Sequence, residues 1–205
     1  MSKPTLTYFD FSGSRGDECR IALHAAGVEF TDNRLKPAAW GDLKANSPFG
    51  SMPMFEVPGK PVLGQSNDLV YIGREHGMHP ADNFEAARHE ALMAYVEEAR
   101  HHISPLLRIK DEAEKLAKRE EIATKYLPQF SVYVEKQLGN GPFVAGDKLN
   151  VADIKLYMFM RWFISGAVDH VPTTVFDRFE KLTHLYKTVA AHPRVAEWVS
   201  RTATA

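Results

Sequence analysis

The sequence is poor in cysteine, in long apolar runs and in excess charge, and each shortage excludes a class of protein. Its single cysteine, Cys19, excludes a framework of intrachain disulfides. No apolar run approaches the roughly 20 residues that a membrane-spanning helix needs. The formal net charge of −1 gives no electrostatic basis for binding nucleic acid or an anionic membrane surface. We therefore expect neither nucleic acid nor a membrane as a partner.

The composition that remains is typical of a folded, water-soluble protein. Of the 205 residues, 44% are hydrophobic, which is enough to bury a core, and 25% are charged. This length suits one large domain or two small ones. The first residues lead directly into a strand-like run without the apolar stretch of a signal peptide. Together with the lone cysteine, this predicts a cytoplasmic location.

The first 80 residues alternate between strand and helix signals, which predicts an α/β domain. The order is strand, helix, strand, then a hairpin and a second main helix. The expected strands lie at 5–9, 28–35, 54–57 and 62–63, and the expected helices at 17–27, 40–45 and 66–75.

From about residue 84 the pattern changes to helix alone. Apolar side chains recur every three or four residues, which is one face of a helix. Asn150 to Asp153 form a capping box, with Asp in the place of Glu, before an apolar helix. We therefore predict an α/β domain at 1–80, a linker at 77–83 and an all-α domain at 84–205. The expected helices of this second domain lie at 84–106, 111–138, 150–164, 177–191 and 193–201.

Three features of the first 66 residues favour a glutathione site when they are taken in order. Tyr8, in the first strand, offers a hydroxyl that can hold a thiolate. The main chain of Met52, directly before Pro53, can pair with an extended peptide. Gln65 and Ser66 open a helix, whose free N–H groups and dipole favour a carboxylate. Each feature alone is weak, and their order and spacing make them specific.

With these residues the chain resembles the cytosolic glutathione transferases over nearly its whole length. It is most similar to the tyrosine-type, sigma-like branch, which includes glutathione-dependent prostaglandin D synthases. The resemblance rests on Leu6 to Phe9, Arg15, Arg20, Trp40, Lys44, Ser47 to Gly50, Met52, Pro53, Gln65 to Asn67 and Gly146 to Asp153.

The resemblance implies a thioredoxin-like domain followed by an α-helical bundle domain, working as a homodimer. Its reaction would be attack of the glutathione thiolate on small hydrophobic electrophiles, with glutathione as co-substrate and no metal. Tyr8 would hold the sulfur, and Arg15 would supply positive charge beside it. A thiol with a pKa near 8.5 is only about 3% ionised at neutral pH, and lowering that pKa by ~2 units takes about 2.7 kcal/mol. One charge-assisted hydrogen bond supplies roughly 1.5–3 kcal/mol.

The resemblance also assigns the contacts that hold the rest of glutathione. Met52 would exchange hydrogen bonds with the cysteinyl backbone, a geometry that requires a cis bond to Pro53. Gln65 and Ser66 would hold the γ-glutamyl carboxylate.

The glycine end of glutathione and its amino group would be held by residues outside these motifs. By the same resemblance, Trp40 and Lys44 would contact the glycine end, and Glu98 would reach the γ-glutamyl amine bound to the other subunit. Each has a plainer alternative: packing for Trp40, and a solvated charge for Lys44 and Glu98.

The electrophile pocket is expected between the aromatic end of the first strand and the helical domain. A tryptophan that lines this pocket in the mammalian synthases has no counterpart in the run His101 to Pro105, so prostaglandin synthesis is not supported. Two alternatives to conjugation stay open: a glutathione-dependent isomerase or peroxidase, and a non-catalytic ligand-binding or structural relative such as a lens crystallin. The expected lining residues are Phe9, Phe11, Ile103, Leu107 and Phe159.

The sequence departs from the family pattern at two places. One extra residue lies between Tyr8 and Arg15, and the helix after Ser66 is one residue shorter. The first change bears on how closely Arg15 approaches the sulfur. It also leaves Ser12 or Ser14 as an alternative group for the thiolate, because other branches of the family use a serine near this position.

Overall fold

The computed structural model describes residues 3–65 and 67–203. The chain divides into two compact units. The first, which we call the N-terminal unit, comprises Met1–His79 and Ala191–Ala205, and the second, the helical unit, comprises Pro80–Ala190. In the described part of the chain, every helix is too short or too polar to cross a membrane.

The last helix, α9 (Pro193–Ala203), belongs to the N-terminal unit, whereas the sequence-based boundary of 84–205 placed it with the other helices. It packs against α1 (Arg15–Ala25). A hydrogen-bond contact of 3.0 Å between His24 Nε2 and Glu197 Oε2 joins the two helices. This contact spans most of the sequence, so local periodicity does not reveal it.

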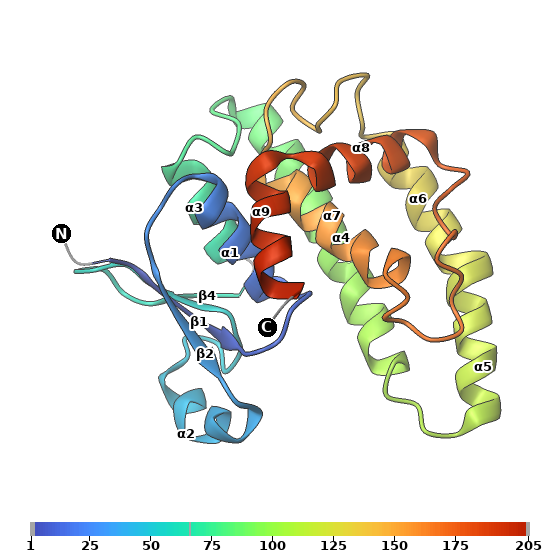
Figure 1. The fold of residues 1–205 in the computed structure, drawn as a ribbon, viewed down its shortest axis with the longest axis horizontal. Coiled ribbons are helices and arrows are strands. Elements are labelled where there is room, and N and C mark those ends of the chain that lie inside the picture. Colours follow the sequence, from blue (N-terminus) through green and yellow to red (C-terminus); the bar gives the residue numbers. More distant parts are fainter. Residues whose placement is uncertain (1–2, 66, 204–205) are drawn as a thin grey trace. The chain divides into compact units, whose positions relative to one another are not determined.

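The sheet of the N-terminal unit, within the described residues, has four strands in the order β2-β1-β3-β4 (Figure 1). β1 (Thr5–Phe9) pairs in parallel with β2 (Thr31–Leu35), and α1 (Arg15–Ala25) forms the crossover that a parallel pair requires. β3 (Met54–Glu56) pairs antiparallel with both β1 and β4 (Leu63–Gly64). The predicted α/β pattern of a thioredoxin-like unit is thereby confirmed.

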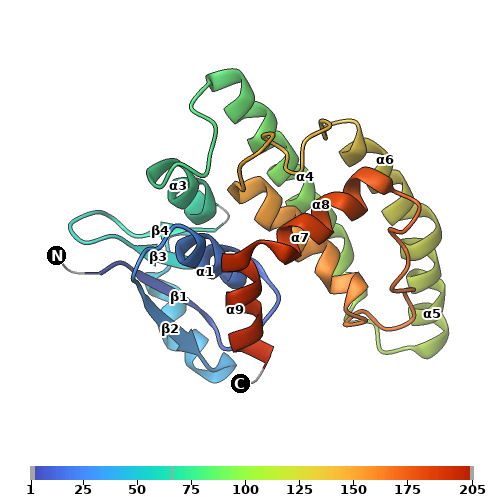
Figure 2. The ribbon, with the colours of Figure 1, turned by 45° about the horizontal axis from the view of Figure 1, so that its top comes forward.

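The helices of this unit lie on either side of the sheet in the view of Figure 1, α1 and α3 above it and α2 below. α3 (Asn67–Glu75) packs against α1, and Figure 2 shows the two side by side. α2 (Trp40–Leu43) is a single turn, extended by 3₁₀ turns at Pro37–Ala39 and Lys44–Asn46.

The strands are held by a buried cluster formed by Tyr8, Leu35, Met52 and Met54, each at most 9% exposed. Burial of one such side chain stabilises the fold by roughly 1.5–3 kcal/mol. The cluster therefore fixes the end of β1 and the segment that leads into β3. Side chains packed around it include Phe9, Trp40, Leu43 and Val62.

The helical unit contains long helices, as its 3.6-residue periodicity predicts. The first of them begins at an N-cap, Asp82, whose carboxylate accepts hydrogen bonds from the N–H groups of Phe84 and Glu85. The helices are α4 (Asn83–Leu106), α5 (Glu112–Glu121), α6 (Leu127–Glu135), α7 (Val151–Ile164) and α8 (Glu180–Ala191).

The single helix predicted for 111–138 is wrong in one respect. A π-helical segment, Ile122–Tyr126, separates α5 from α6, and α6 ends at Glu135. Pro128 lies in the first turn of α6, where its missing N–H removes the usual hydrogen bond to the residue four positions earlier. The proline is the local reason why the ladder changes register here.

The capping box predicted before α7 is confirmed. The Asn150 side chain accepts a hydrogen bond from the Ala152 N–H at 2.8 Å, and the Asp153 carboxylate accepts one from the Asn150 N–H at 2.9 Å. Asp153 also accepts the Val144 N–H at 2.7 Å, which ties the preceding loop to the helix. Burial raises the pKa of Asp153 to about 7, against the lowering effect of these two backbone hydrogen bonds.

Candidate active site

Tyr8 is the central residue of the candidate site and lies near the end of β1. Its side chain is only 5% exposed. Its hydroxyl donates a hydrogen bond of 3.1 Å to Ser14 Oγ. Its ring lies directly against the backbone of Gly16, so closely that a Cβ on Gly16 would come within 2.8 Å of the Tyr8 Cβ and closer still to the ring. The ring is therefore held in one position.

The turn from β1 into α1 brings Ser14 to Tyr8. Ser14 is the N-cap of α1, and its carbonyl accepts the N–H groups of Asp17 and Glu18 at 2.9 and 3.2 Å. The carboxylate of Asp17 reaches back to accept the N–H of Gly13 at 2.7 Å. The guanidinium of Arg20 donates to the other oxygen of Asp17 at 3.0 Å.

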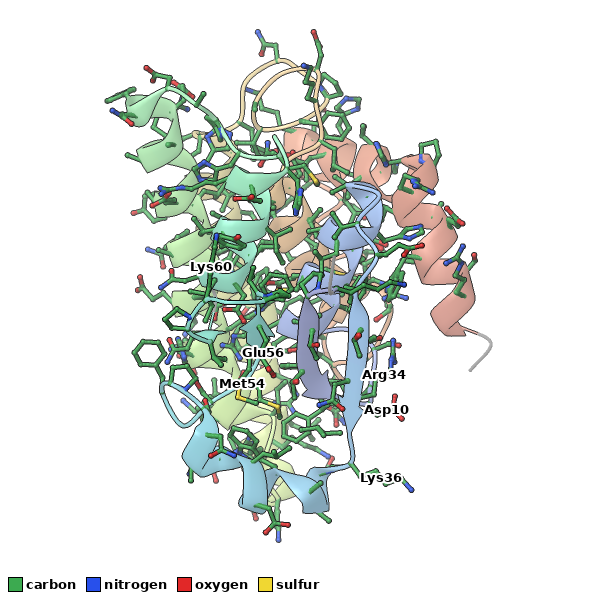
Figure 3. The ribbon with its side chains drawn as sticks, turned by 90° about the vertical axis from the view of Figure 1, so that its left-hand side faces the viewer. Asp10, Arg34, Lys36, Met54, Glu56 and Lys60 are labelled. Atoms are coloured by element: carbon green, nitrogen blue, oxygen red, sulfur yellow. The ribbon has the colours of Figure 1, made fainter. Side chains whose placement is uncertain are left out.

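A chain of alternating charges anchors this turn to the sheet. Arg20 also donates to Asp32 Oδ1 at 2.8 Å, and Arg34 donates to Asp32 Oδ2 at 2.7 Å. Arg34 then reaches Asp10 at 3.2 Å, and Figure 3 shows these two side chains together at the edge of the sheet. Asp10 and Asp17 lie at the two ends of the turn, so both ends are held.

Positive charge lies near Tyr8 in the form of Arg20, whose Cζ is 5.9 Å from the ring centroid. Arg20 is fully buried. Arg15, the residue predicted to supply this charge, is the first residue of α1 and is half-buried. Its action on a bound thiol stays a prediction. Ser12, in the turn, is exposed.

The segment expected to clamp the peptide backbone lies beside Tyr8. The Met52–Pro53 peptide bond is cis, as predicted. Met52 is buried in the same cluster as Tyr8. Within the described residues, its main-chain N–H and carbonyl take no part in any turn, loop or cap hydrogen bond. They are therefore the two groups that we expect to meet a ligand.

Gln65 connects this segment to α3. Its N–H donates to the Pro53 carbonyl at 3.1 Å, and its φ of 65° places it in the left-handed region. A non-glycine residue there costs of order 1–3 kcal/mol and tends to occur at functional sites. The side chain of Gln65 is exposed. Ser66, the other predicted carboxylate ligand, lies outside the described residues.

Asp68, in the first turn of α3, is a buried carboxyl group for which the sequence predicted no role. It is fully buried, and among the described residues neither carboxylate oxygen has a hydrogen-bond partner. Burial raises the pKa of this group to about 8. Asp68 is therefore largely protonated at neutral pH, close to the point where a ligand carboxylate is expected.

The aromatic residues predicted at the end of the first strand do lie together. The ring centroids of Phe9 and Phe11 are 5.7 Å from that of Tyr8, and Trp40 lies 6.4 Å from Phe9, edge to face. Phe11 is 47% exposed. Lys44 is exposed one turn beyond Trp40. This partly exposed aromatic surface beside the Tyr8 ring is suited to an apolar ligand.

The remaining predicted residues belong to the helical unit. Ile103 and Phe159 are fully buried, and Phe159 packs against Phe130 with the ring centroids 4.8 Å apart. Both therefore contribute to the core of this unit. Leu107 is half-buried and Glu98 is exposed on α4. The part that these residues play in binding an electrophile or glutathione stays a prediction.

The structure adds residues that the sequence did not assign to the site. Gly16 touches Tyr8 across a turn, which no spacing rule reveals. The Asp17–Arg20 pair is spaced three residues apart on a helix, and that spacing is the signal that could have indicated it. In the described part of the chain, no group of three or more His, Cys, Asp or Glu residues could hold a metal ion.

A thioredoxin-like sheet unit with an appended helical unit defines the class of protein, and comparisons with known proteins give the family. The glutathione S-transferase N-terminal domain model matches residues 4–67, and the C-terminal domain model matches 97–202. Glutathione S-transferase 1 of Ascaris suum is 32% identical over 162 residues, covering 75% of this chain and 77% of that protein. The chain belongs to the glutathione S-transferase family.

Two further relatives bear on the branch within the family. S-crystallin 4 of Enteroctopus dofleini is 25% identical, over 98% of this chain and 97% of its own. The structure of prostaglandin synthase D of Nilaparvata lugens matches with a TM-score of 0.83 and 25% identity, over 98% of both chains. The predicted resemblance to the prostaglandin D synthase-like branch is confirmed.

Proposed function

We propose that the protein is a glutathione transferase that joins the sulfur of glutathione to small hydrophobic electrophiles. The thiol first loses its proton. The thiolate then attacks an electrophilic carbon and a carbon–sulfur bond forms. Either a leaving group such as a halide departs with its electron pair, or, at an activated double bond, the π bond breaks and the neighbouring carbon takes up a proton. Family membership supports this class of reaction.

The observation that carries the proposal is the packing of Tyr8 and Met52 in one buried cluster. The phenol can donate to a sulfur, while the main chain of Met52 holds the cysteinyl residue that bears this sulfur. A charge-assisted hydrogen bond in a buried site is worth roughly 1.5–3 kcal/mol, which is a lowering of the thiol pKa by about one to two units. Arg15 would add to that effect.

The remaining groups complete the glutathione site in this proposal. Gln65 and Ser66 hold the γ-glutamyl carboxylate at the start of α3, where free N–H groups favour an anion. Trp40 and Lys44 hold the glycine end. The half-buried ring of Phe9 and the exposed ring of Phe11 would contact the electrophile. Ile103, Leu107 and Phe159 stay the lining that the sequence predicts from the helical domain.

We further propose that the protein is a cytoplasmic homodimer. Glu98 of one subunit would then reach the γ-glutamyl amine bound to the other. The exposed position of Glu98 on α4 supports such a contact.

An assay of products tests the proposed reaction against its alternatives. The protein is incubated with glutathione and, in turn, an aryl halide, an α,β-unsaturated carbonyl compound and an organic hydroperoxide. Thioether products support conjugation. Formation of glutathione disulfide from the hydroperoxide would indicate a peroxidase. A rearranged substrate with the thiol unchanged would indicate an isomerase. The absence of any turnover would indicate a structural relative like the S-crystallins.

A further inference from the structure

We propose that Ser14 is a positioning residue for this reaction. Its hydroxyl is hydrogen-bonded to that of Tyr8, and when Tyr8 donates its proton to the glutathione thiolate, Ser14 donates to the Tyr8 oxygen. This inference rests on the proposed function, because it needs a thiolate at Tyr8. It differs from direct activation by a serine, since Ser14 acts through the tyrosine.

The first observation is the hydrogen bond itself. Tyr8 and Ser14 are 5% and 7% exposed, and their oxygens are 3.1 Å apart. A phenol has one proton to donate, whereas a serine hydroxyl can both donate and accept. When Tyr8 donates to a thiolate, Ser14 turns its own proton toward the tyrosine oxygen. Each hydrogen bond in such a chain polarises the next, which makes Tyr8 a stronger donor.

The second observation is that Ser14 does not perform the usual task of a serine at its position. It is the N-cap of α1, yet its side chain makes no capping hydrogen bond. A serine at an N-cap normally accepts the N–H of the second or third helical residue. Here the Ser14 hydroxyl oxygen accepts the hydrogen bond of Tyr8 instead. The first turn of α1 therefore lacks the side-chain capping hydrogen bond that a serine at this position usually makes.

The third observation is that neighbouring groups hold both hydroxyls in place. Asp17 fixes the turn through the Gly13 N–H at 2.7 Å, and Arg20 fixes Asp17 at 3.0 Å. Gly16 fixes the ring of Tyr8 from the other side. The anchored turn brings the Ser14 hydroxyl against the phenol at 3.1 Å. The two hydroxyls are therefore prearranged before a ligand binds.

The test compares Tyr8→Phe, Ser14→Ala, Ser14→Thr and the double variant Tyr8→Phe/Ser14→Ala. For each we measure glutathione affinity, the ultraviolet titration of the bound thiolate, and the pH profile of conjugation. We expect Ser14→Ala to bind glutathione normally, to raise the apparent pKa of the bound thiol by about half a unit to one unit, and to lose roughly threefold to tenfold in rate at neutral pH. Ser14→Thr, which keeps a hydroxyl, should restore most of the rate.

The double variant shows whether the two hydroxyls act as one unit. We expect it to be no slower than Tyr8→Phe alone, because the serine acts only through the tyrosine. Ser165→Ala, which removes an exposed serine hydroxyl at the end of α7, is the control. An unshifted titration in Ser14→Ala, or losses that multiply in the double variant, would overturn the inference. If Tyr8→Phe itself leaves the titration unshifted, the tyrosine role in the proposed function fails instead.

Discussion

The backbone of Gly16 lies against the ring of Tyr8, in the space that any side chain at position 16 would need. The first turn of α1 thus packs against the ring of the candidate catalytic tyrosine and fixes its position. In a helix, glycine is less favourable than alanine by roughly 0.8–1 kcal/mol. The contact therefore places a glycine where helix propensity alone would disfavour it.

Gly16→Ala should lower both stability and conjugation rate. Overpacking of a buried site costs typically 1–3 kcal/mol, more than the gain in helix propensity, and the ring of Tyr8 must move to make room. Urea unfolding and the rate at neutral pH measure the two effects. Gly41→Ala is the control, because a Cβ at position 41 meets no atom within 4 Å. If Gly16→Ala and Gly41→Ala had the same stability and the same rate, the contact between Gly16 and Tyr8 would not position the ring.

Tyr8→Phe should keep glutathione binding and lose most of the rate at neutral pH. In the proposed site the phenol would touch only the sulfur, whereas other groups would hold the peptide. A loss of roughly 1.5–3 kcal/mol of thiolate stabilisation corresponds to a tenfold to hundredfold slower reaction. Steady-state kinetics and the thiolate titration check this. Tyr71→Phe is the control and should keep the full rate, because the Tyr71 hydroxyl lies outside the site and accepts a hydrogen bond from Lys60 Nζ at 3.2 Å.

The sequence predicted the local elements of this fold well and the long-range contacts poorly. Periodicity and caps are properties of neighbouring residues, so β1, α1 and the capping box before α7 were predictable. The motif Met52–Pro53 was also readable, because its chemistry depends on two adjacent residues. The change from α-helix to π-helix before Pro128 also has a local cause, since proline has no N–H to donate to a helical hydrogen bond.

The contacts that shape the site could not be predicted in this way. The approach of Gly16 to Tyr8 depends on the path of the turn between them. The packing of α9 against α1 joins segments that are far apart in the chain. The burial of Asp68 depends on what covers the start of α3. In each case the partner is set by tertiary packing, which a single sequence does not display.

Glu98→Ala should raise the glutathione concentration needed for half-maximal rate and leave the fold intact. The reason is the proposed contact with the ligand amine in the other subunit of a dimer. Kinetics at varied glutathione, with solution scattering for the oligomeric state, measure this. Glu120→Ala makes the same change at an exposed position of α5 and should behave as the unchanged protein. A monomer with normal glutathione affinity would refute the shared site.

Arg20→Ala should destabilise the N-terminal unit strongly. Arg20 is fully buried between Asp17 and Asp32, and removing one partner of a buried ion pair costs roughly 3–5 kcal/mol. Arg34→Ala is the matched control, because the Arg34 side chain is 30% exposed and such pairs contribute at most about 1 kcal/mol. Chemical unfolding of both variants gives the comparison. Similar losses in the two would mean that Arg20 does not anchor the turn.

Asp68→Asn should change how stability depends on pH. Burial raises the pKa of Asp68 in the folded state to about 8, from an ordinary value of 3.8. The folded state therefore keeps a proton that the unfolded state releases as the pH rises above about 4. The free energy of unfolding is therefore unaffected by this group below about pH 4, and it falls progressively as the pH rises from there toward 8.

The amide in Asp68→Asn resembles the protonated acid but does not titrate. The variant should therefore become more stable than the unchanged protein as the pH rises, by at most about 1.4 kcal/mol per pH unit between pH 4 and 8. Urea unfolding at a series of pH values measures this difference. Asp42→Asn alters an exposed carboxylate, and its free energy of unfolding should depend on pH in the same way as that of the unchanged protein. A constant difference between Asp68→Asn and the unchanged protein over this range would show that Asp68 is ionised in the folded state, and that a partner compensates its charge.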